Sequence, residues 1–301
     1  MESHFFSPGK LLLTAEYFVL DGALALAVPT KVGQEMTVRK EESNQHIISW
    51  NAFHQGKTWL NVLLNFETWS ILETNIPEAA AFVQDLLQGI AKRNPRAFQS
   101  GNRYHFTTNL QFPPNFGLGS SSTLINNLAE WSGTDAFDLN SEYLKGSGYD
   151  IAVAQQKQAI LFQNQPEMMV KPVMFEPAFK DDLIFVHLNR KQDSRKGIEL
   201  YRSQRKNPAL IQEFSELTNR FLHAENIGSL ENVIREHEVK LSSFLGISGV
   251  QNQLFSDYGG AVKSLGAWGG DFVLATKTEG WENYFRSRNF PEIFSWEELI
   301  K

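Results

Sequence analysis

The stretch PPNFGLGSSSTL, residues 113–124, places two glycines and three consecutive serines directly before a segment whose apolar residues have helical spacing. Inside a helix, glycine costs about 1 kcal/mol relative to alanine, and serine competes for backbone hydrogen bonds. At the start of a helix both residue types are useful, because glycine accepts positive φ angles and serine caps exposed N–H groups. We therefore predict that this stretch is a loop that opens a helix.

A glycine-rich turn at a helix start directs several backbone N–H groups and the positive end of the helix dipole to one place, which favours an anion such as phosphate. The predicted phosphate-binding residues are Gly117, Leu118, Gly119, Ser120, Ser121 and Ser122. Taken alone, this pattern is more often a capped helix start than a nucleotide site. It is not a Walker loop, and the Walker-like Gly56-Lys57-Thr58 lacks the glycine required five positions earlier, where Asn51 stands.

The chain has 301 residues, with 34 acidic and 28 basic side chains, a net charge of −6 and no cysteine. This length predicts one large or two modest domains. The charge gives no support to nucleic-acid binding, and the lack of cysteine excludes disulfides and thiolate catalysis. The start MESHFFSPGK has no signal-peptide pattern, and the most apolar stretch, residues 11–28, contains Glu16 and Asp21. We therefore expect a cytoplasmic protein without a membrane span.

Apolar periodicity divides the chain into strands and helices. Strands are expected at residues 10–13, 17–20, 23–28, 35–40, 46–50, 104–108, 159–162 and 183–188, and a hairpin at 264–276. Helices are expected from residue 77, after the loop at 124–131, at 140–145, from 148, and at 210–221, 230–244 and 281–288. The pattern predicts an α+β protein of two layered domains, residues 1–174 and 175–301.

Three further stretches combine glycine with charged residues: SPGKLLLTAEYFVLDG at 7–22, GSGYDIA at 146–152 and LGAWGGDF at 265–272. Each has an ordinary structural explanation, namely a hairpin, an aspartate in the first turn of a helix, and a bulged hairpin. The seven histidines form no pair with the spacing of metal ligands, and His237 lies on an apolar helix stripe, where we expect it to pack.

In their order along the chain, PGKLLLTAEY, PPNFGLGSSS, GSGYDIA and GAWGGD resemble the motifs of the GHMP kinase superfamily of galactokinase, homoserine kinase, mevalonate kinase and phosphomevalonate kinase. KQDSRKG at 191–197 and HEVKLSSFLGIS at 237–248 agree with this resemblance, which spans most of the chain. The first and last motifs are most similar to the mevalonate and phosphomevalonate kinase branch.

The resemblance implies a two-domain GHMP kinase fold. Its N-terminal domain would be a ribosomal-protein-like α/β domain with a left-handed βαβ crossover, which is rare. Its C-terminal domain would be ferredoxin-like. ATP would lie between the domains with its phosphates on the glycine loop, and Mg²⁺ would neutralise part of their charge.

The resemblance also implies roles for individual residues. Asp150 matches the aspartate that takes or orients the proton of the substrate hydroxyl, and Lys10 matches the lysine of the first motif, which holds that aspartate ionised. Ser121 matches the serine that binds the metal, and Glu142 is the nearest candidate for an acidic metal ligand. The acceptor and phosphates would be contacted by Glu16, Tyr17, Lys191, Ser194, Gly266, Gly269 and Gly270.

Several positions depart from the family pattern. Ala15 and Trp268 stand where the family has glycine, and Ser121 and Asp150 are only 29 positions apart (150 − 121), a shorter separation than is usual. We expect an ATP- and Mg²⁺-dependent kinase of a small, anionic metabolite such as mevalonate or phosphomevalonate. The basic run from Arg190 to Lys206 is either a solvated face or part of the acceptor site. The alternatives are an inactive nucleotide- or metabolite-binding sensor and an ATP-dependent decarboxylase of the diphosphomevalonate type.

Overall fold

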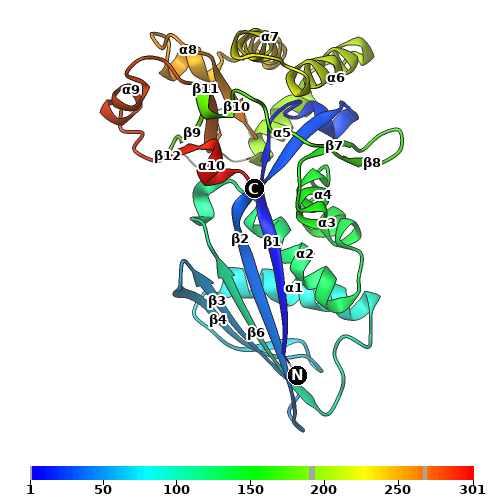
Figure 1. Cartoon of the computed structure of the whole chain (residues 1–301). Helices are drawn as coiled ribbons and strands as arrows, with labels where there is room; N and C mark the ends of the chain where they lie inside the picture. Colours follow the sequence, from blue (N-terminus) through cyan, green and yellow to red (C-terminus); the bar gives the residue numbers. More distant parts are fainter. Residues whose placement is uncertain (1, 190–193, 267–269) are drawn as a thin grey trace. The chain divides into compact units, whose positions relative to one another are not determined.

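The computed structural model describes residues 2–189, 194–266 and 270–301 (Figure 1). The chain forms two compact units that are not continuous in sequence. The first unit comprises residues up to Gly9 together with Val32–Pro114 and Leu118–Lys157, and the second comprises Lys10–Lys31, Asn115–Gly117 and Gln158–Lys301. The division predicted near residue 174 lies inside the second unit, because residues 10–31 and 158–174 also group with the C-terminal part of the chain.

The first unit contains a sheet with the strand order β5-β4-β3-β6-β2, and β1 also pairs with β2. The strands are β1 (Glu2–Leu12), β2 (Ala25–Glu42), β3 (Ile47–His54), β4 (Lys57–Asn65), β5 (Ser70–Thr74) and β6 (Asn102–Leu110). β3 and β6 run parallel, whereas β6 runs antiparallel to β2, and β4 antiparallel to both β3 and β5.

Helices cover one face of this sheet. They are α1 (Pro77–Arg93), α2 (Ser120–Ser132), α3 (Ala136–Tyr143) and α4 (Tyr149–Gln156). Alternate residues of β4, such as Leu60, Val62 and Leu64, share one buried cluster with Leu86 of α1 and Ile125 of α2. This packing explains the elements, since a strand with alternating burial and a helix with an apolar stripe can only exclude water by covering one another.

The second unit contains β7 (Ile160–Gln163) and β8 (Met169–Pro172), which extend the sheet from the first part of β2, and a separate antiparallel sheet with the order β10-β11-β9-β12. That sheet consists of β9 (Leu183–His187), β10 (Val262–Leu265), β11 (Phe272–Thr276) and β12 (Ile293–Ser295). The unit also contains α5 (Ser194–Ser203), α6 (Pro208–Leu222), α7 (Ile227–Leu245), α8 (Val250–Leu254), α9 (Trp281–Ser287) and α10 (Trp296–Leu299).

Most predicted helices and strands are confirmed, including the hairpin, in which Leu265 pairs with Phe272. The strand predicted at residues 17–20 is wrong: Phe18–Asp21 is a short 3₁₀ helix, enclosed by positive φ angles at Tyr17 and Gly22 that a strand cannot contain. A short apolar run does not by itself distinguish the two structures.

Two further boundaries differ from the predictions. The strands expected at 23–28 and 35–40 are one strand, β2, and the intervening Gly33 lets β1 approach closely, because a Cβ there would lie 2.2 Å from the Ser7 carbonyl oxygen. The helix expected at 140–145 is α3, which begins at Ala136 because the Asp135 carboxylate accepts the N–H groups of Phe137 and Asp138.

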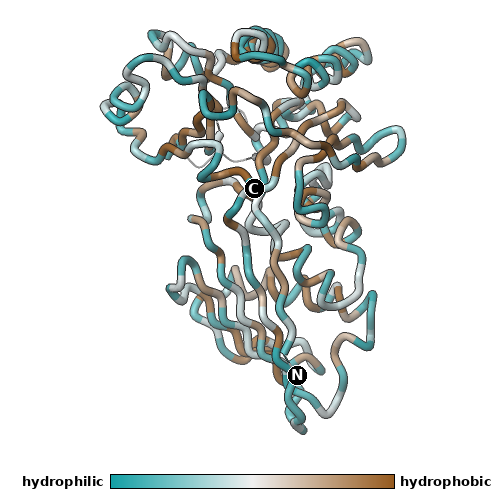
Figure 2. The backbone as a smooth tube through the Cα atoms, viewed as in Figure 1, coloured by the Kyte–Doolittle hydropathy of each residue, from teal (hydrophilic) through white to brown (hydrophobic). Residues whose placement is uncertain are grey.

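Figure 2 shows hydrophilic and hydrophobic residues alternating along α6 and α7. Within the described ranges, no helix is both long enough and apolar enough to cross a membrane.

Candidate active site

The glycine loop adopts the geometry that its sequence predicts. Gly119 is the N-cap of α2 with φ 88°, and Gly117 has φ 66°, so both occupy the left-handed region that favours glycine. The Gly119 carbonyl accepts the first helical hydrogen bond from Thr123 N (2.9 Å) and a second from Ser122 Oγ (2.9 Å). The Ser122 hydroxyl therefore serves the helix, whereas Ser120 and Ser121 are half-buried at its first turn.

Buried polar side chains fix the start of α2 against β1 and β2. Ser7 Oγ donates to Asn127 Oδ1 (2.7 Å) and accepts from Asn126 Nδ2 (2.9 Å). Asn127 Nδ2 donates to the Gln34 carbonyl (2.9 Å), and Thr123 Oγ1 donates to Gln34 Oε1 (2.8 Å). These bonds satisfy buried polar groups and hold the helix in one position, so that its first N–H groups are preorganised.

Three of the four motifs meet at Gly117, inside the second unit. Lys10 Nζ donates a hydrogen bond to the Gly117 carbonyl (3.1 Å). A Cβ atom added to Gly117 would lie only 1.9 Å from Asp271 Oδ2, so the Asp271 carboxylate lies against the loop backbone. We call Lys10, Gly117 and Asp271 the glycine-loop cluster. It brings together residues that are 107 and 154 positions apart in sequence (117 − 10 and 271 − 117).

The segment before Gly117 is anchored by aromatic packing. The Phe116 ring lies 4.3 Å from the His187 ring and 5.4 Å, edge to face, from the Phe272 ring, measured between centroids. His187 Nε2 lies 3.3 Å from the Asn115 carbonyl oxygen. Since His187 ends β9 and Phe272 begins β11, the four-stranded sheet of the second unit sets the position of the loop entrance.

Asp150 lies in the first turn of α4, which begins after Gly148 with φ 95°. It is half-buried and belongs to the first unit together with Ser120 and Ser121. Leu118 is fully buried, so only its backbone is available to a ligand.

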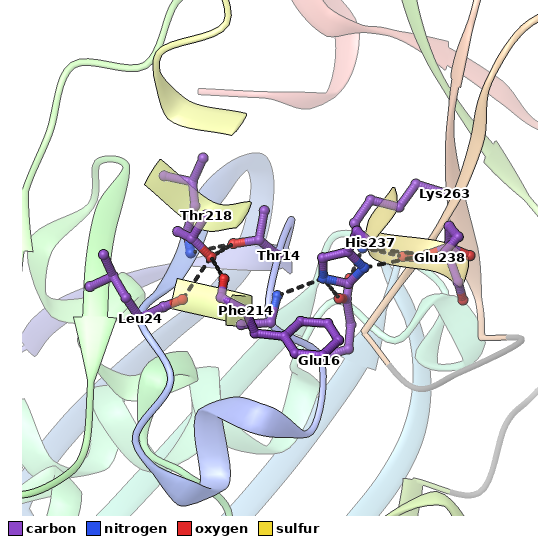
Figure 3. A network of polar contacts seen from close by, with 11 residues as sticks. Thr14, Glu16, Leu24, Phe214, Thr218, His237, Glu238 and Lys263 are labelled. Atoms are coloured by element: carbon purple, nitrogen blue, oxygen red, sulfur yellow. Dashed lines mark hydrogen bonds and ion pairs between the residues drawn. The ribbon is translucent and has the colours of Figure 1, made fainter. Parts of the chain in front are cut away.

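Glu16 is fully buried in an ion network (Figure 3). Lys263 of β10, also fully buried, donates from Nζ to Glu16 Oε1, and His237 Nε2 of α7 lies 3.1 Å from Glu16 Oε2. Glu238 Oε1 lies 3.7 Å from both Lys263 Nζ and His237 Nδ1. We call these four residues the buried ion network. In this structure Glu16 therefore binds charged groups of its own chain.

Burial by itself would raise the pKa of the Glu16 carboxyl, but the Lys263 ammonium and then His237 outweigh it, and the net shift is downward. His237 Nε2 also accepts a hydrogen bond from the Ala15 N–H (3.1 Å). His237 does pack as predicted, edge to face with Phe214 (5.0 Å), but it also has this polar role that the sequence prediction left out.

The backbone next to Glu16 has the conformation that favours glycine, although this chain has alanine at position 15. Ala15 has φ 59°, in the left-handed region where glycine is favoured, and Tyr17 has φ 63°. The Tyr17 hydroxyl lies against α5, since a Cβ on Gly197 would be 2.1 Å from it, and its ring stacks on Tyr201 at 5.8 Å. Burial, and then a hydrogen bond to Asp21, raise the pKa of the Tyr201 hydroxyl.

Glu142, the predicted acidic metal ligand, gives its carboxylate to Arg93 of α1, and this hydrogen bond lowers the pKa of Glu142. Among the residues that the structure describes, no group of three or more His, Asp or Glu side chains has a metal-binding arrangement.

The structure describes only some of the remaining predicted site residues. Gly266, with φ 70°, directly follows β10, and Gly270 is buried. Lys191, Trp268 and Gly269 lie outside the described residues, and for Ser194 the structure gives only its position as the first residue of α5.

Sequence reasoning missed the contact of Asp271 with the loop and the roles of Lys263 and Glu238. One signal was available: Lys263 interrupts the apolar stretch AVKSL, and a lysine inside a buried strand requires an acidic partner.

No protein-family model matches the sequence, and no curated protein matches it significantly. Solved structures do match. Methanococcus jannaschii mevalonate kinase superposes with a TM-score of 0.70 at 16% identity, covering 98% of this chain and 97% of that chain. Streptococcus pneumoniae phosphomevalonate kinase, in complex with phosphomevalonate and AMPPNP, gives 0.69 at 15% identity, covering 97% and 98%. Mevalonate diphosphate decarboxylase from Staphylococcus aureus gives 0.59 at 14% identity, covering 99% and 94%.

These similarities extend over nearly the whole of both chains in each pair. They show that the chain has the fold of the GHMP kinase superfamily, with mevalonate and phosphomevalonate kinases among its structural neighbours. The resemblance that the four motifs indicated is thus confirmed at the level of the fold. Because two kinases and a decarboxylase share this fold, the reaction has to be argued from the site.

Proposed function

We propose that this protein is an ATP-dependent small-molecule kinase that transfers the γ-phosphate to a hydroxyl or phosphate of a small anionic metabolite. The observation that carries the proposal is the glycine-loop cluster: an ammonium, a glycine backbone with positive φ and a carboxylate meet where α2 is about to begin. Phosphoryl transfer depends mainly on positioning and charge neutralisation, which such groups supply.

In this proposal ATP places its phosphates at the first N–H groups of α2, around Ser120 and Ser121, where the helix dipole favours negative charge. Asp150 takes the proton of the acceptor hydroxyl as the acceptor oxygen bonds to the γ-phosphorus and the bond to ADP breaks. The Lys10 ammonium stabilises the negative charge that develops at the reacting oxygens.

Bound Mg²⁺ would neutralise phosphate charge. We propose Ser121 as one of its protein ligands. Glu142 remains the acidic candidate from the sequence, but it would have to leave Arg93 to bind the metal. Asp271 is a second acidic candidate, because a carboxylate beside a phosphate loop repels phosphate unless a cation lies between them. A shift in the Mg²⁺ dependence of turnover in Asp271→Asn, but not in Glu142→Gln, would select Asp271.

The acceptor is proposed to be mevalonate- or phosphomevalonate-like. Tyr17 contacts α5, the helix that carries Lys196 and Arg202 from the basic run, so a polar hydroxyl and cationic side chains belong to neighbouring elements of the second unit. Such a pairing suits a carboxylate or phosphate on the acceptor. Because Glu16 is paired with Lys263, we propose that it helps to position the neighbouring Tyr17 and does not itself contact the acceptor.

The test is ADP release from ATP and Mg²⁺ with mevalonate, phosphomevalonate and other small alcohols, comparing wild type with Asp150→Asn. We expect turnover with one acceptor, and a loss of 10²- to 10⁴-fold in the variant with ATP affinity retained. Equal rates in the two proteins would remove the assigned base.

The same assay separates the alternatives. Carbon dioxide released in step with ADP from a diphosphorylated acid would identify a decarboxylase, in line with the fold shared with the Staphylococcus aureus enzyme. Nucleotide binding without ADP release for any acceptor would identify a sensor.

A further inference from the structure

The first unit contains a cavity of about 250 Å³ at the end of α2 that lies farthest from the glycine loop. Its walls come from five places: the last residues of α2 with Trp131 and Ser132, the loop after α1 with Asn94 and Arg96, and the strands β1, β2 and β6. Since α2 runs for 13 residues and a helix rises about 1.5 Å per residue, the cavity is roughly 20 Å from the phosphate loop. It is therefore a separate site.

The cavity walls are held in place by hydrogen bonds between side chains and backbone groups. Asn94 Nδ2 donates to the Ser132 carbonyl (2.7 Å), and Asn94 Oδ1 accepts from Arg96 N (3.1 Å). The Tyr104 hydroxyl accepts from Gln99 N (2.9 Å). These bonds tie the loop after α1 to α2 and to β6, so the walls are preformed, as in most small-molecule sites.

The charge of the walls selects an anion. Two of the ten lining residues, Lys40 and Arg96, are basic, and none is acidic. Lys40 Nζ donates to the neutral Gln99 Oε1 (2.6 Å). Within the described part of the chain, the Arg96 guanidinium has neither an ion pair nor a hydrogen bond. A guanidinium with open donors binds carboxylate and phosphate groups through two parallel bonds.

The C-terminal ends of α1 and α2 also face this region, and their partial negative charge would oppose an anion. One carbonyl group at each of these ends already has a partner, however: Ile90 O accepts from Asn94 N (2.8 Å), and Ala129 O accepts from Thr134 N (3.1 Å). Leu128 O accepts from Ser132 Oγ (2.7 Å). The basic side chains, Lys40 and Arg96, therefore decide that the cavity favours a negatively charged ligand.

The apolar part of the cavity wall, formed by the Trp131 ring, favours a planar group on the ligand. Trp131 is half-buried, and its ring packs edge to face against Phe106 (4.8 Å) and Tyr104 (6.2 Å), which fixes its orientation. A fixed indole beside a cationic rim suits a ring or planar apolar group that carries an oxyanion. The volume suits a compound smaller than a nucleotide.

We propose that this cavity is a second ligand site, which binds a small aromatic or other planar metabolite carrying a phosphate or carboxylate group, independently of the phosphate loop. Arg96 and Lys40 hold the oxyanion, and Trp131 contacts the ring. The proposal does not depend on the kinase assignment, since the site shares no residue with it.

The test is calorimetric titration of the full chain with phenyl phosphate. We expect saturable binding that Arg96→Gln weakens at least tenfold, and that persists when ATP is present in excess. The matched control is Arg39→Gln, which removes a basic residue next to Lys40 on β2 but outside the cavity lining, where Arg39 pairs with Glu41 at the surface. This control should bind phenyl phosphate as wild type does.

Three comparison ligands define the chemistry. Benzoate that binds equally well would show that the site accepts either oxyanion, whereas inorganic phosphate and benzyl alcohol should each bind at least tenfold more weakly than phenyl phosphate. Since Arg96 is exposed, its substitution should leave the unfolding temperature unchanged. The proposal is overturned if phenyl phosphate shows no saturable binding, if ATP displaces it, or if Arg96→Gln binds it as tightly as wild type does.

Discussion

The glycine-loop cluster and the buried ion network connect the same two segments of the chain in opposite ways. Lys10 and Glu16 belong to the first motif, and Lys263 and Asp271 to the last hairpin. In the network, Glu16 and Lys263 are wholly buried and bind each other directly. In the cluster, Gly117 is exposed and offers backbone to an ammonium and a carboxylate.

The difference indicates that the buried ion network and the glycine-loop cluster have different roles within the second unit. A buried ion pair is costly to form and more costly to break, so it fixes which segments lie together. A lysine on a backbone carbonyl loses little when it exchanges that partner for a phosphate oxygen, because the new acceptor is charged. The Glu16–Lys263 ion pair fixes how the two segments pack, and the Lys10–Gly117 contact is suited to a ligand. Substitutions in the two places should therefore have opposite signatures in stability and activity.

The largest effect is expected from Lys263→Met. This change leaves the Glu16 carboxylate buried without its ammonium, which costs about 3–5 kcal/mol of unfolding free energy. Urea unfolding followed by circular dichroism measures the loss. The double variant Glu16→Gln with Lys263→Met should lose less than the single variant, because the fully buried side chain at position 16 is then neutral as well; a loss below 1 kcal/mol in the single variant would contradict the role given to the network.

Lys10→Gln should behave in the opposite way. If Lys10 acts on the phosphates, turnover falls by about 10²-fold, which corresponds to roughly 2.7 kcal/mol. The free energy of unfolding should change by less than about 1 kcal/mol, since Lys10 is only half-buried. Lys57→Gln, at the exposed first residue of β4, is the control for loss of surface charge. Unchanged turnover in Lys10→Gln would contradict the catalytic role proposed for the glycine-loop cluster.

Gly117→Ala tests the loop backbone itself. The φ of 66° costs a non-glycine residue about 1–2 kcal/mol, and the new Cβ would also displace Asp271. Gly101→Ala is the matched control, because Gly101 has φ 80° with open space around its Cβ position, so it measures the backbone cost alone. Urea unfolding should show a larger loss for Gly117→Ala, and adding Asp271→Ala should recover the difference. Equal losses in the two single variants would argue against the contact with Asp271.

The smallest effect is the acid dependence of the network. The pKa of Glu16 is lower in the folded chain, so its contribution to stability is present above the ordinary glutamate pKa of about 4.3 and is lost as the pH falls toward the folded value. The slope is at most about 1.4 kcal/mol per pH unit for one proton. Stability curves of wild type and Glu16→Gln should therefore converge between about pH 5 and 3; parallel curves would show that Glu16 does not titrate with folding.

Much of the fold could be predicted from short stretches of neighbouring residues. Glycines and serines before an apolar stripe predicted both the loop and α2, and the helix starting at Pro77 begins where proline is tolerated. The turn at residues 15–17 could not be read in this way. Nothing in the neighbouring residues indicates that Ala15 and Tyr17 have positive φ, because both conformations depend on partners far along the chain.

For the candidate site, the sequence determined which residues are present and where helices and turns begin, because those properties follow from the conformational preferences of neighbouring residues. It also determined the resemblance, through four motifs in order. Only the tertiary structure decided that Glu16 pairs with Lys263, 247 positions away, and that Asp271 lies against Gly117. Such contacts depend on which buried charges and backbone groups the packed chain brings together, and that is a property of the whole fold rather than of any short segment.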